Sequence, residues 1–145
     1  MQEIQIASID DIQTLEDFLV ENATEEDRPL AQKYIKAMFS EDYRKPTFLL
    51  LKEDQKIIAA AAYSEEFFTI GLWGISWVCV KKEKRDQGFG TKIMQECMKQ
   101  ISKKAGKPVT VILNTYPNKT GLYDNLGFKK AGEDHEGGSL MIKYI

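Results

Sequence analysis

Hydrophobic and polar residues follow two periods along this chain, and the two periods predict strands alternating with helices. Residues 91–104 place Ile93, Met94, Cys97, Met98 and Ile101 on one stripe at helical spacing, whereas residues 77–80 form a short apolar run typical of a buried strand. The predicted strands are residues 2–8, 47–52, 57–64, 71–80, 109–114, 129–133 and 139–144. The predicted helices are residues 11–21, capped by Asp10 or Asp11, and residues 25–39, 88–104 and 118–125.

The order of these elements predicts an α/β (α+β) fold with a mixed sheet. A strand, a helix and a second strand follow one another over residues 71–114, and such a unit pairs its two strands in parallel. Short turns join the flanking strands, which therefore pair as antiparallel hairpins. No internal repeat interrupts this pattern, so we expect residues 1–145 to form one domain.

Composition and charge exclude several classes of protein. The 145 residues are 43% hydrophobic and 29% charged, as in ordinary globular domains, and the formal net charge is −2 with both signs interspersed. These values argue against a nucleic-acid-binding surface. No apolar run approaches the roughly 20 residues of a membrane span, and no secretion signal is evident, so a cytoplasmic protein without a membrane partner is expected. Cys79 and Cys97, far apart, are expected to be reduced thiols in the core.

The segment between the strand ending at residue 80 and the helix starting near residue 88 has the features of an anion site. Gly88 and Gly90 let a ligand approach the backbone, and the first N–H groups of a helix lack intrahelical partners. A dinucleotide fingerprint fails because Ile93 stands where a third Gly is needed, and a P-loop fails because Phe89 alone separates the two glycines. What remains is R-x-x-G-x-G at residues 85–90.

This pattern resembles motif A of the GCN5-related N-acetyltransferases (GNAT), whose loop holds the pyrophosphate of acetyl-coenzyme A. Residues 109–128 (VTVILNTYPNKTGLYDNLGF) are similar to motif B of the same family, in the expected order. The resemblance implies a single mixed, mostly antiparallel sheet with helices on both faces and a central parallel pair splayed around the coenzyme. It also implies direct transfer of an acetyl group from acetyl-CoA to a primary amine of a small molecule or protein, in a ternary complex and without a metal.

The same resemblance implies which residues bind the coenzyme. In the first strand of the parallel pair, the backbone of residues 78–80 (Val78, Cys79, Val80) would form hydrogen bonds with the pantetheine arm. The pyrophosphate loop would comprise Arg85, Asp86, Gln87, Gly88, Phe89, Gly90 and Thr91. Position 86 is often Gly in the family, so the Asp86 carboxylate has to point away from the phosphates. Asn114 and Asn118 would bind pantetheine or backbone groups, although Asn118 could instead be a helix N-cap.

Tyr123 is the expected catalytic acid, because a phenol held against the sulfur can hydrogen-bond to or protonate the departing thiolate. Glu65 or Glu66, or an ordered water, is the candidate general base. The only histidine, His135, fits a solvated turn, and the aromatic residues Phe67, Phe68, Trp73 and Trp77 could line an acceptor pocket or belong to the core.

Other functions stay open at this point. One alternative is a non-catalytic acyl-CoA-binding or sensing module of the same fold, and another is an unrelated nucleotide-binding domain. The protein is expected to be a monomer or a homodimer. The acceptor amine is not specified by the sequence, because acceptor loops diverge within the family.

Overall fold

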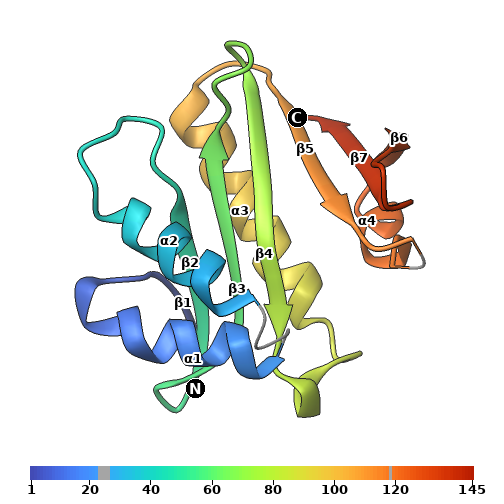
Figure 1. The fold of residues 1–145 in the computed structure, drawn as a ribbon. Coiled ribbons are helices and arrows are strands. Elements are labelled where there is room, and N and C mark those ends of the chain that lie inside the picture. Colours follow the sequence, from blue (N-terminus) through green and yellow to red (C-terminus); the bar gives the residue numbers. More distant parts are fainter. Residues whose placement is uncertain (23–26, 118) are drawn as a thin grey trace.

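The computed structural model describes residues 1–22, 27–117 and 119–145, in which seven strands form one mixed sheet in the order β1-β2-β3-β4-β5-β7-β6 (Figure 1). The strands are β1 (Gln2–Ile6), β2 (Thr47–Glu53), β3 (Lys56–Glu65), β4 (Leu72–Val80), β5 (Thr110–Thr115), β6 (Lys129–Glu133) and β7 (Ser139–Tyr144). The α-helices are α1 (Ile12–Asn22), α2 (Arg28–Met38), α3 (Phe89–Ala105) and α4 (Gly121–Asn125).

The pairing confirms the predicted topology. β4 and β5 are parallel, and every other neighbouring pair in the sheet is antiparallel. The parallel pair is joined through α3, as a parallel connection requires a crossover. The central strand β3 lies between β2 and β4 and carries four consecutive, fully buried alanines, Ala59 to Ala62, which let helices pack closely on both faces.

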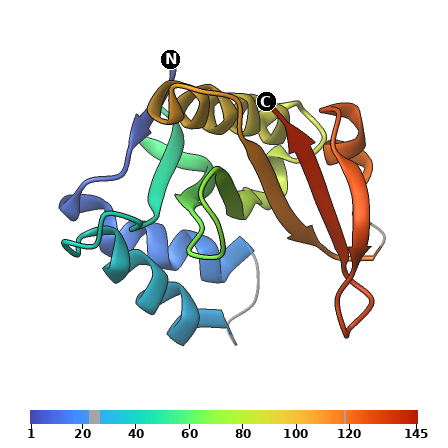
Figure 2. The ribbon, with the colours of Figure 1, turned by 90° about the horizontal axis from the view of Figure 1, so that it is seen from above.

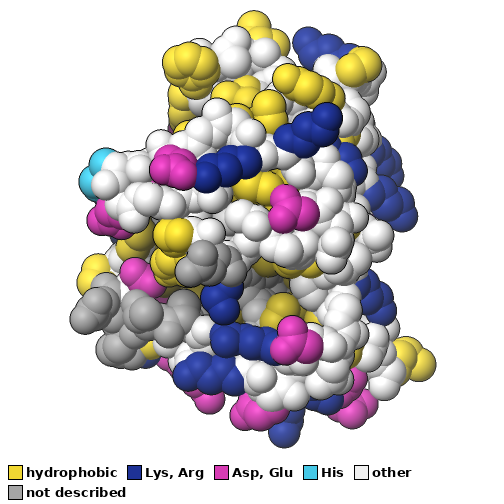
Figure 3. Space-filling model, turned by 90° about the vertical axis from the view of Figure 1, so that its right-hand side faces the viewer, with side chains coloured by type: hydrophobic (Ala, Val, Ile, Leu, Met, Phe, Trp, Pro, Cys, Tyr) yellow, Lys and Arg dark blue, Asp and Glu magenta, His cyan; other side chains and the backbone are white. Residues whose placement is uncertain are grey.

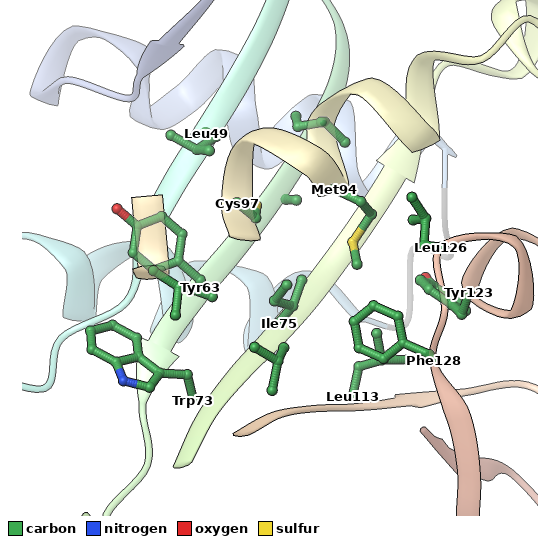
Figure 4. Close-up of a cluster of buried hydrophobic side chains, with 14 of the residues drawn as sticks. Leu49, Tyr63, Trp73, Ile75, Met94, Cys97, Leu113, Tyr123, Leu126 and Phe128 are labelled. Carbon is green, nitrogen blue, oxygen red and sulfur yellow. The ribbon is translucent and has the colours of Figure 1, made fainter. Parts of the chain in front are cut away.

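Helices cover both faces of the sheet, as Figure 2 shows. Alternation along β2 explains why: Leu49 and Leu51 pack with α3, whereas Phe48 and Leu50 pack with α1 and α2. Four residues of the stripe predicted from the sequence, Ile93, Met94, Cys97 and Ile101, are fully buried, and the fifth, Met98, is partly buried against them. Figure 4 shows this cluster, in which side chains from the sheet meet side chains from α3 and α4.

Two predicted helix boundaries are wrong. The first helical segment begins as the 3-10 helix η1 (Ile9–Asp11), with Ser8 rather than Asp10 or Asp11 at the N-cap. The Asp11 carboxylate instead accepts a 2.8 Å hydrogen bond from the Ser8 backbone N–H, as the third residue of a capping box does. The short helix predicted from residue 118 begins at Gly121.

Residues 25, 26 and 118, which the sequence placed in helices, lie outside the described residues. In the part of the chain that the structure describes, no helix combines the length and the apolar character that crossing a bilayer requires.

Candidate active site

A cavity of about 980 Å³ opens where β4 and β5 diverge. Their parallel pairing covers three residue pairs, from Leu72 with Thr110 to Gly74 with Ile112. Beyond that point Ile75 to Val80 line one wall of the cavity and Leu113 to Thr115 line another. The edge of β4 that faces β5 is therefore open to a ligand over its second half. An extended molecule with amide groups can add to such an edge as a further strand does.

A bulge in β4 lies at the centre of this open edge. Ala60 pairs with Cys79 and Ala62 with Ser76, so two residues of β4 stand opposite the single residue Ala61. One of the two, Trp77, has a φ of 54°, a conformation that costs a bulky residue about 1–3 kcal/mol. The bulge re-aims the backbone where it lines the cavity, which is a common use of bulges beside active sites.

The loop between β4 and α3 closes one end of the cavity. Gly88 is the N-cap of α3 with a φ of 86°, and Gly90 lies 3.1 Å from Leu122, measured from the position that a Cβ would occupy. The first hydrogen bond of the helix runs from the Lys92 N–H to the Gly88 carbonyl, at 3.0 Å. The N–H groups of residues 89–91 thus have no acceptor inside the helix, and they sit at the positive end of its dipole. Lys84, Arg85 and Lys119 add positive charge to the lining.

Asp86 follows Arg85 in this loop and has a positive φ. Its φ is 61°, the left-handed region that glycine favours and that aspartate tolerates better than most side chains. Asp86 is exposed and lines the cavity, so it is a negative charge close to the N-terminus of α3.

Arg85 lies in the predicted loop, but its guanidinium is bonded to protein. Nε donates to the Val80 carbonyl at 3.2 Å, and a terminal nitrogen donates to the Asn22 carbonyl at 2.9 Å. The side chain therefore ties the loop to the C-terminal end of α1. A contact between this guanidinium and a pyrophosphate stays a prediction.

Tyr123 of α4 lines the cavity from the side opposite β4. The side chain is 8% exposed, and its ring meets the Phe128 ring edge-to-face with centroids 6.1 Å apart (Figure 4). Burial raises the pKa of the phenol to about 12. Among the described residues, none forms a hydrogen bond with the phenol oxygen. A neutral O–H group is thus held at the cavity wall without a competing protein acceptor.

Asn114 is the penultimate residue of β5, beside the cavity, and connects β5 to the β6–β7 turn. Its amide donates to the Asp134 carboxylate at 2.7 Å. That bond, with backbone bonds from Gly138 and Glu136, keeps the pKa of Asp134 below its ordinary value. Asn114 lines the cavity as predicted, while Asn118 lies outside the described residues.

The predicted coenzyme residues converge on one cavity. Those that line it are Val78, Cys79, Val80, Arg85, Asp86, Gly88, Phe89, Gly90, Thr91 and Asn114, together with the predicted acid Tyr123. Gln87 lies in the loop, where its side chain donates to the Glu83 carbonyl at 3.3 Å.

Glu65 and Glu66 are placed elsewhere. Within the described parts of the chain neither residue lines the cavity, and Glu65 pairs with Trp73, at the end of β4 where β4 still pairs with β5. Its carboxylate lies 3.7 Å from Nε of Arg44. The structure thus does not bring either glutamate beside Tyr123, and the general-base role stays a prediction.

Several cavity residues gave no signal in the sequence. Leu19, Asn22 and Asp27 come from the α1–α2 region, more than fifty residues before the loop that they face. Asp27 and Asp86 are the carboxylates that line the cavity among the described residues. Asp27 is the N-cap of α2, just before Arg28 and Pro29. An acidic residue at that position is common at helix starts, so nothing in the sequence assigned it to a binding site.

The two thiols behave as the sequence predicted. Cys79 and Cys97 are free and buried, and burial raises the pKa of Cys79 to about 11 and that of Cys97 to about 12. Both are therefore protonated at neutral pH, and a thiol in that state is a poor nucleophile.

The four aromatic residues considered for an acceptor pocket lie in different places. Trp73 is in the core and Trp77 lines the cavity, whereas Phe67 and Phe68 are exposed.

The sequence profile of the acetyltransferase (GNAT) domain matches residues 15–144. The chain belongs to the GNAT acetyltransferase family. No curated protein sequence matches the chain closely. Figure 3 shows the side of the molecule on which the splayed strands open. Lys and Arg side chains gather below a hollow in this face.

Solved structures share the whole fold at low sequence identity. The PaiA N-acetyltransferase from Thermoplasma acidophilum, in complex with coenzyme A, has a TM-score of 0.78 at 19% identity, covering 100% of this chain and 99% of its own. A GNAT family N-acetyltransferase from Escherichia coli, also in complex with CoA, has a TM-score of 0.78 at 15% identity, covering 99% and 81%. An acyl-CoA N-acyltransferase from Pseudomonas aeruginosa has a TM-score of 0.80 at 15% identity, covering 99% of both chains. The sheet with its splayed parallel pair is therefore the GNAT fold.

Proposed function

We propose that this GNAT protein is an acetyl-CoA-dependent N-acetyltransferase that transfers the acetyl group directly to a primary amine. The observation that carries the proposal is one cavity combining an open strand edge, a helix N-terminus and a buried, neutral phenol. Each of these features suits a different part of an acyl-CoA molecule. The coenzyme complexes of two proteins with the same fold support the same cofactor.

The cavity fits the coenzyme at both ends. The backbone of Val78 and the N–H group of Val80 are available to the amides of the pantetheine arm, because β5 has already left the edge of β4. The Val80 carbonyl, in contrast, accepts a hydrogen bond from Arg85. The N–H groups at the start of α3 suit the pyrophosphate. A Cβ built on Gly88 would meet no protein atom within 4 Å, so the loop leaves room for a ligand where a side chain would otherwise project.

The thioester supplies the activated acetyl group, and the protein's part is to place the amine and to stabilise the departing sulfur. The amine nitrogen attacks the carbonyl carbon, the carbon–sulfur bond breaks, and the thiolate leaves with negative charge. An ordinary alkyl thiol has a pKa of about 8.5, well below the value of about 12 for Tyr123. The phenol therefore stabilises the thiolate by donating a hydrogen bond and keeps its own proton. The amine proton leaves to a carboxylate or to an ordered water.

Acetyl-CoA should raise the melting temperature of the protein. A ligand present at a hundredfold excess over its Kd stabilises the folded state by about 2.7 kcal/mol. For a domain of this size that corresponds to roughly 5–10 °C. Thermal denaturation with increasing acetyl-CoA checks binding, and release of free thiol in the presence of a panel of primary amines checks transfer.

The two readouts separate the proposal from its alternative. Binding with amine-dependent thiol release is the expected result. Binding without release for every amine tested would indicate a non-catalytic coenzyme-binding module, and no change in melting temperature at millimolar acetyl-CoA would contradict the assignment altogether.

Replacing Asp86 by Asn should tighten coenzyme binding. Asn tolerates the left-handed backbone at this position as Asp does, so the substitution removes one negative charge and keeps the loop geometry. Because the position is exposed and screened, we expect Kd to fall by about two- to fivefold. Calorimetric titration with coenzyme A at low and high salt checks this, with the gain shrinking as salt rises. An unchanged Kd would show that the carboxylate points away from the phosphates.

A further inference from the structure

Asn22, the last residue of α1, joins this helix to the coenzyme loop through its side chain. The residue is 7% exposed. Its amide nitrogen donates to the Phe18 carbonyl at 2.9 Å, and its amide oxygen accepts the backbone N–H of Lys82 at 2.9 Å. The second bond spans sixty residues of sequence. Both the nitrogen and the oxygen of the amide are thus hydrogen-bonded, one inside the helix and one to the segment that follows β4.

The backbone of Asn22 makes a further connection to the same segment. Its carbonyl accepts the 2.9 Å hydrogen bond from Arg85, whose Nε also donates to Val80. Lys82 begins the short 3-10 helix η3 (Lys82–Lys84), and Arg85 follows that helix directly. One residue of α1 therefore holds both ends of η3.

The segment beyond η3 needs such support. Asp86 and Gly88 both have positive φ values, 61° and 86°, and loops containing left-handed residues keep one shape only when their surroundings determine it. A loop that is already ordered binds its ligand more tightly than one that has to be ordered on binding, because the entropy cost is smaller.

We propose that Asn22 is a positioning residue for coenzyme binding, acting through Lys82 and Arg85 to hold the pyrophosphate loop in its binding conformation. The inference rests on the proposed use of acetyl-CoA. A purely structural role, in which Asn22 simply ends α1, accounts for the bond to Phe18, since Asn near a helix end often bonds the carbonyl four residues earlier. It does not account for the bond to Lys82.

Lys82 offers a test that leaves the core untouched. Lys82→Pro removes the backbone N–H that Asn22 accepts, and the site suits proline: it is the first residue of η3, and Lys81 before it is extended with a ψ of 133°. Lys82→Ala is the matched control, because it removes the same ammonium group and keeps the N–H. Asn22→Ala removes the other partner of the same bond.

The measurement is the Kd for coenzyme A by calorimetry, together with KM for acetyl-CoA and kcat at saturation. We expect Lys82→Pro to bind about three- to tenfold more weakly than Lys82→Ala, as the loss of one hydrogen bond predicts. Asn22→Ala should show a similar loss relative to wild type, with kcat within twofold in each case. A loss of affinity shared by the two Lys82 variants would be due to the missing ammonium group. The difference in Kd between them therefore measures the contribution of the backbone N–H.

Equal Kd values for Lys82→Pro and Lys82→Ala, with Asn22→Ala binding like wild type, would overturn the positioning role while leaving the proposed function in place. Wild-type protein that fails to bind coenzyme A would overturn the proposed function and this inference with it. If Lys82→Pro does not fold, as judged by circular dichroism, Asn22→Ala decides: a fall in kcat without a rise in KM contradicts the proposal.

Discussion

We expect the Gly88→Val variant to lose at least about 100-fold in affinity for coenzyme A, equivalent to about 2.8 kcal/mol. Gly88 has a φ of 86° at the N-cap of α3, a conformation that a β-branched residue adopts at a cost of about 1–2 kcal/mol. The new side chain would also occupy the space at Gly88 that no protein atom fills. Strain would move the N–H groups of α3, and the side chain would compete with the phosphates. Calorimetric titration with coenzyme A measures the loss.

Gly106→Val is the matched control for this experiment. Gly106 is the residue at the other end of α3, with a φ of 66° and, like Gly88, no atom within 4 Å of a Cβ. Valine there carries a similar backbone strain at a position outside the cavity lining. Both variants should melt at a lower temperature than wild type, and only Gly88→Val should lose coenzyme binding. Equal affinities of the two variants for coenzyme A would show that the loop at Gly88 is not part of the binding site.

The second large effect is expected at Tyr123. Tyr123→Phe keeps the ring and its edge-to-face contact with Phe128 and removes only the hydroxyl group. Loss of one hydrogen-bond donor to a developing negative charge typically costs about 10²–10³ in kcat. A coenzyme A thiolate is already a fair leaving group, so we expect a fall of about 100-fold with an unchanged Kd for acetyl-CoA. Steady-state kinetics with an amine found by the thiol-release screen measures it.

Tyr63→Phe provides the control for removing a buried tyrosine hydroxyl. Tyr63 is 1% exposed, and its hydroxyl donates to Gln100 at 2.8 Å, outside the cavity. That variant should lose stability, by about 0.5–1.5 kcal/mol for one hydrogen bond, and keep its kcat. If Tyr123→Phe kept the wild-type kcat as well, Tyr123 would be a packing residue beneath Phe128.

The dependence on pH tests the same hydroxyl group. A phenol of ordinary pKa, about 10, would be half ionised at pH 10. Burial raises the pKa of Tyr123 to about 12, so its proton is retained below that pH and lost only as the pH rises through it. The ratio of wild-type to Tyr123→Phe kcat should therefore stay constant from pH 7 to pH 10. A ratio that falls between pH 9 and pH 10 would contradict the buried, neutral phenol.

Local patterns in the sequence were enough to predict most of the helices and strands and the glycine-containing loop before α3. The helical stripe of α3 and the apolar run of β2 are properties of neighbouring residues, and the structure confirms the helix and the strand that they predict. Gly88 and Gly90 could be recognised because glycine at a strand-to-helix turn serves a backbone requirement that does not depend on distant partners. Tyr123 could be named as a candidate because the motif that carries it is short and contiguous.

Side-chain partners were decided by the tertiary structure. The Arg85 guanidinium, expected at a pyrophosphate, is bonded to Val80 and to Asn22, sixty-three residues away. Glu65 is the last residue of β3, one residue beyond the predicted end of that strand, and the register of β3 with β4 places it beside Trp73 and away from the cavity. No local period encodes such pairings, because they depend on how strands align and on where a helix ends.

The bulge at Trp77 has the same cause. The apolar run of β4 predicts a strand, and an extra residue in that strand appears only when its partner β3 is in place. The sequence by itself therefore determined the parallel pair with its flanking antiparallel hairpins, the family and the glycine loop. The tertiary structure decided which side chains reach the cavity, because that depends on register and packing across segments that are far apart in the chain.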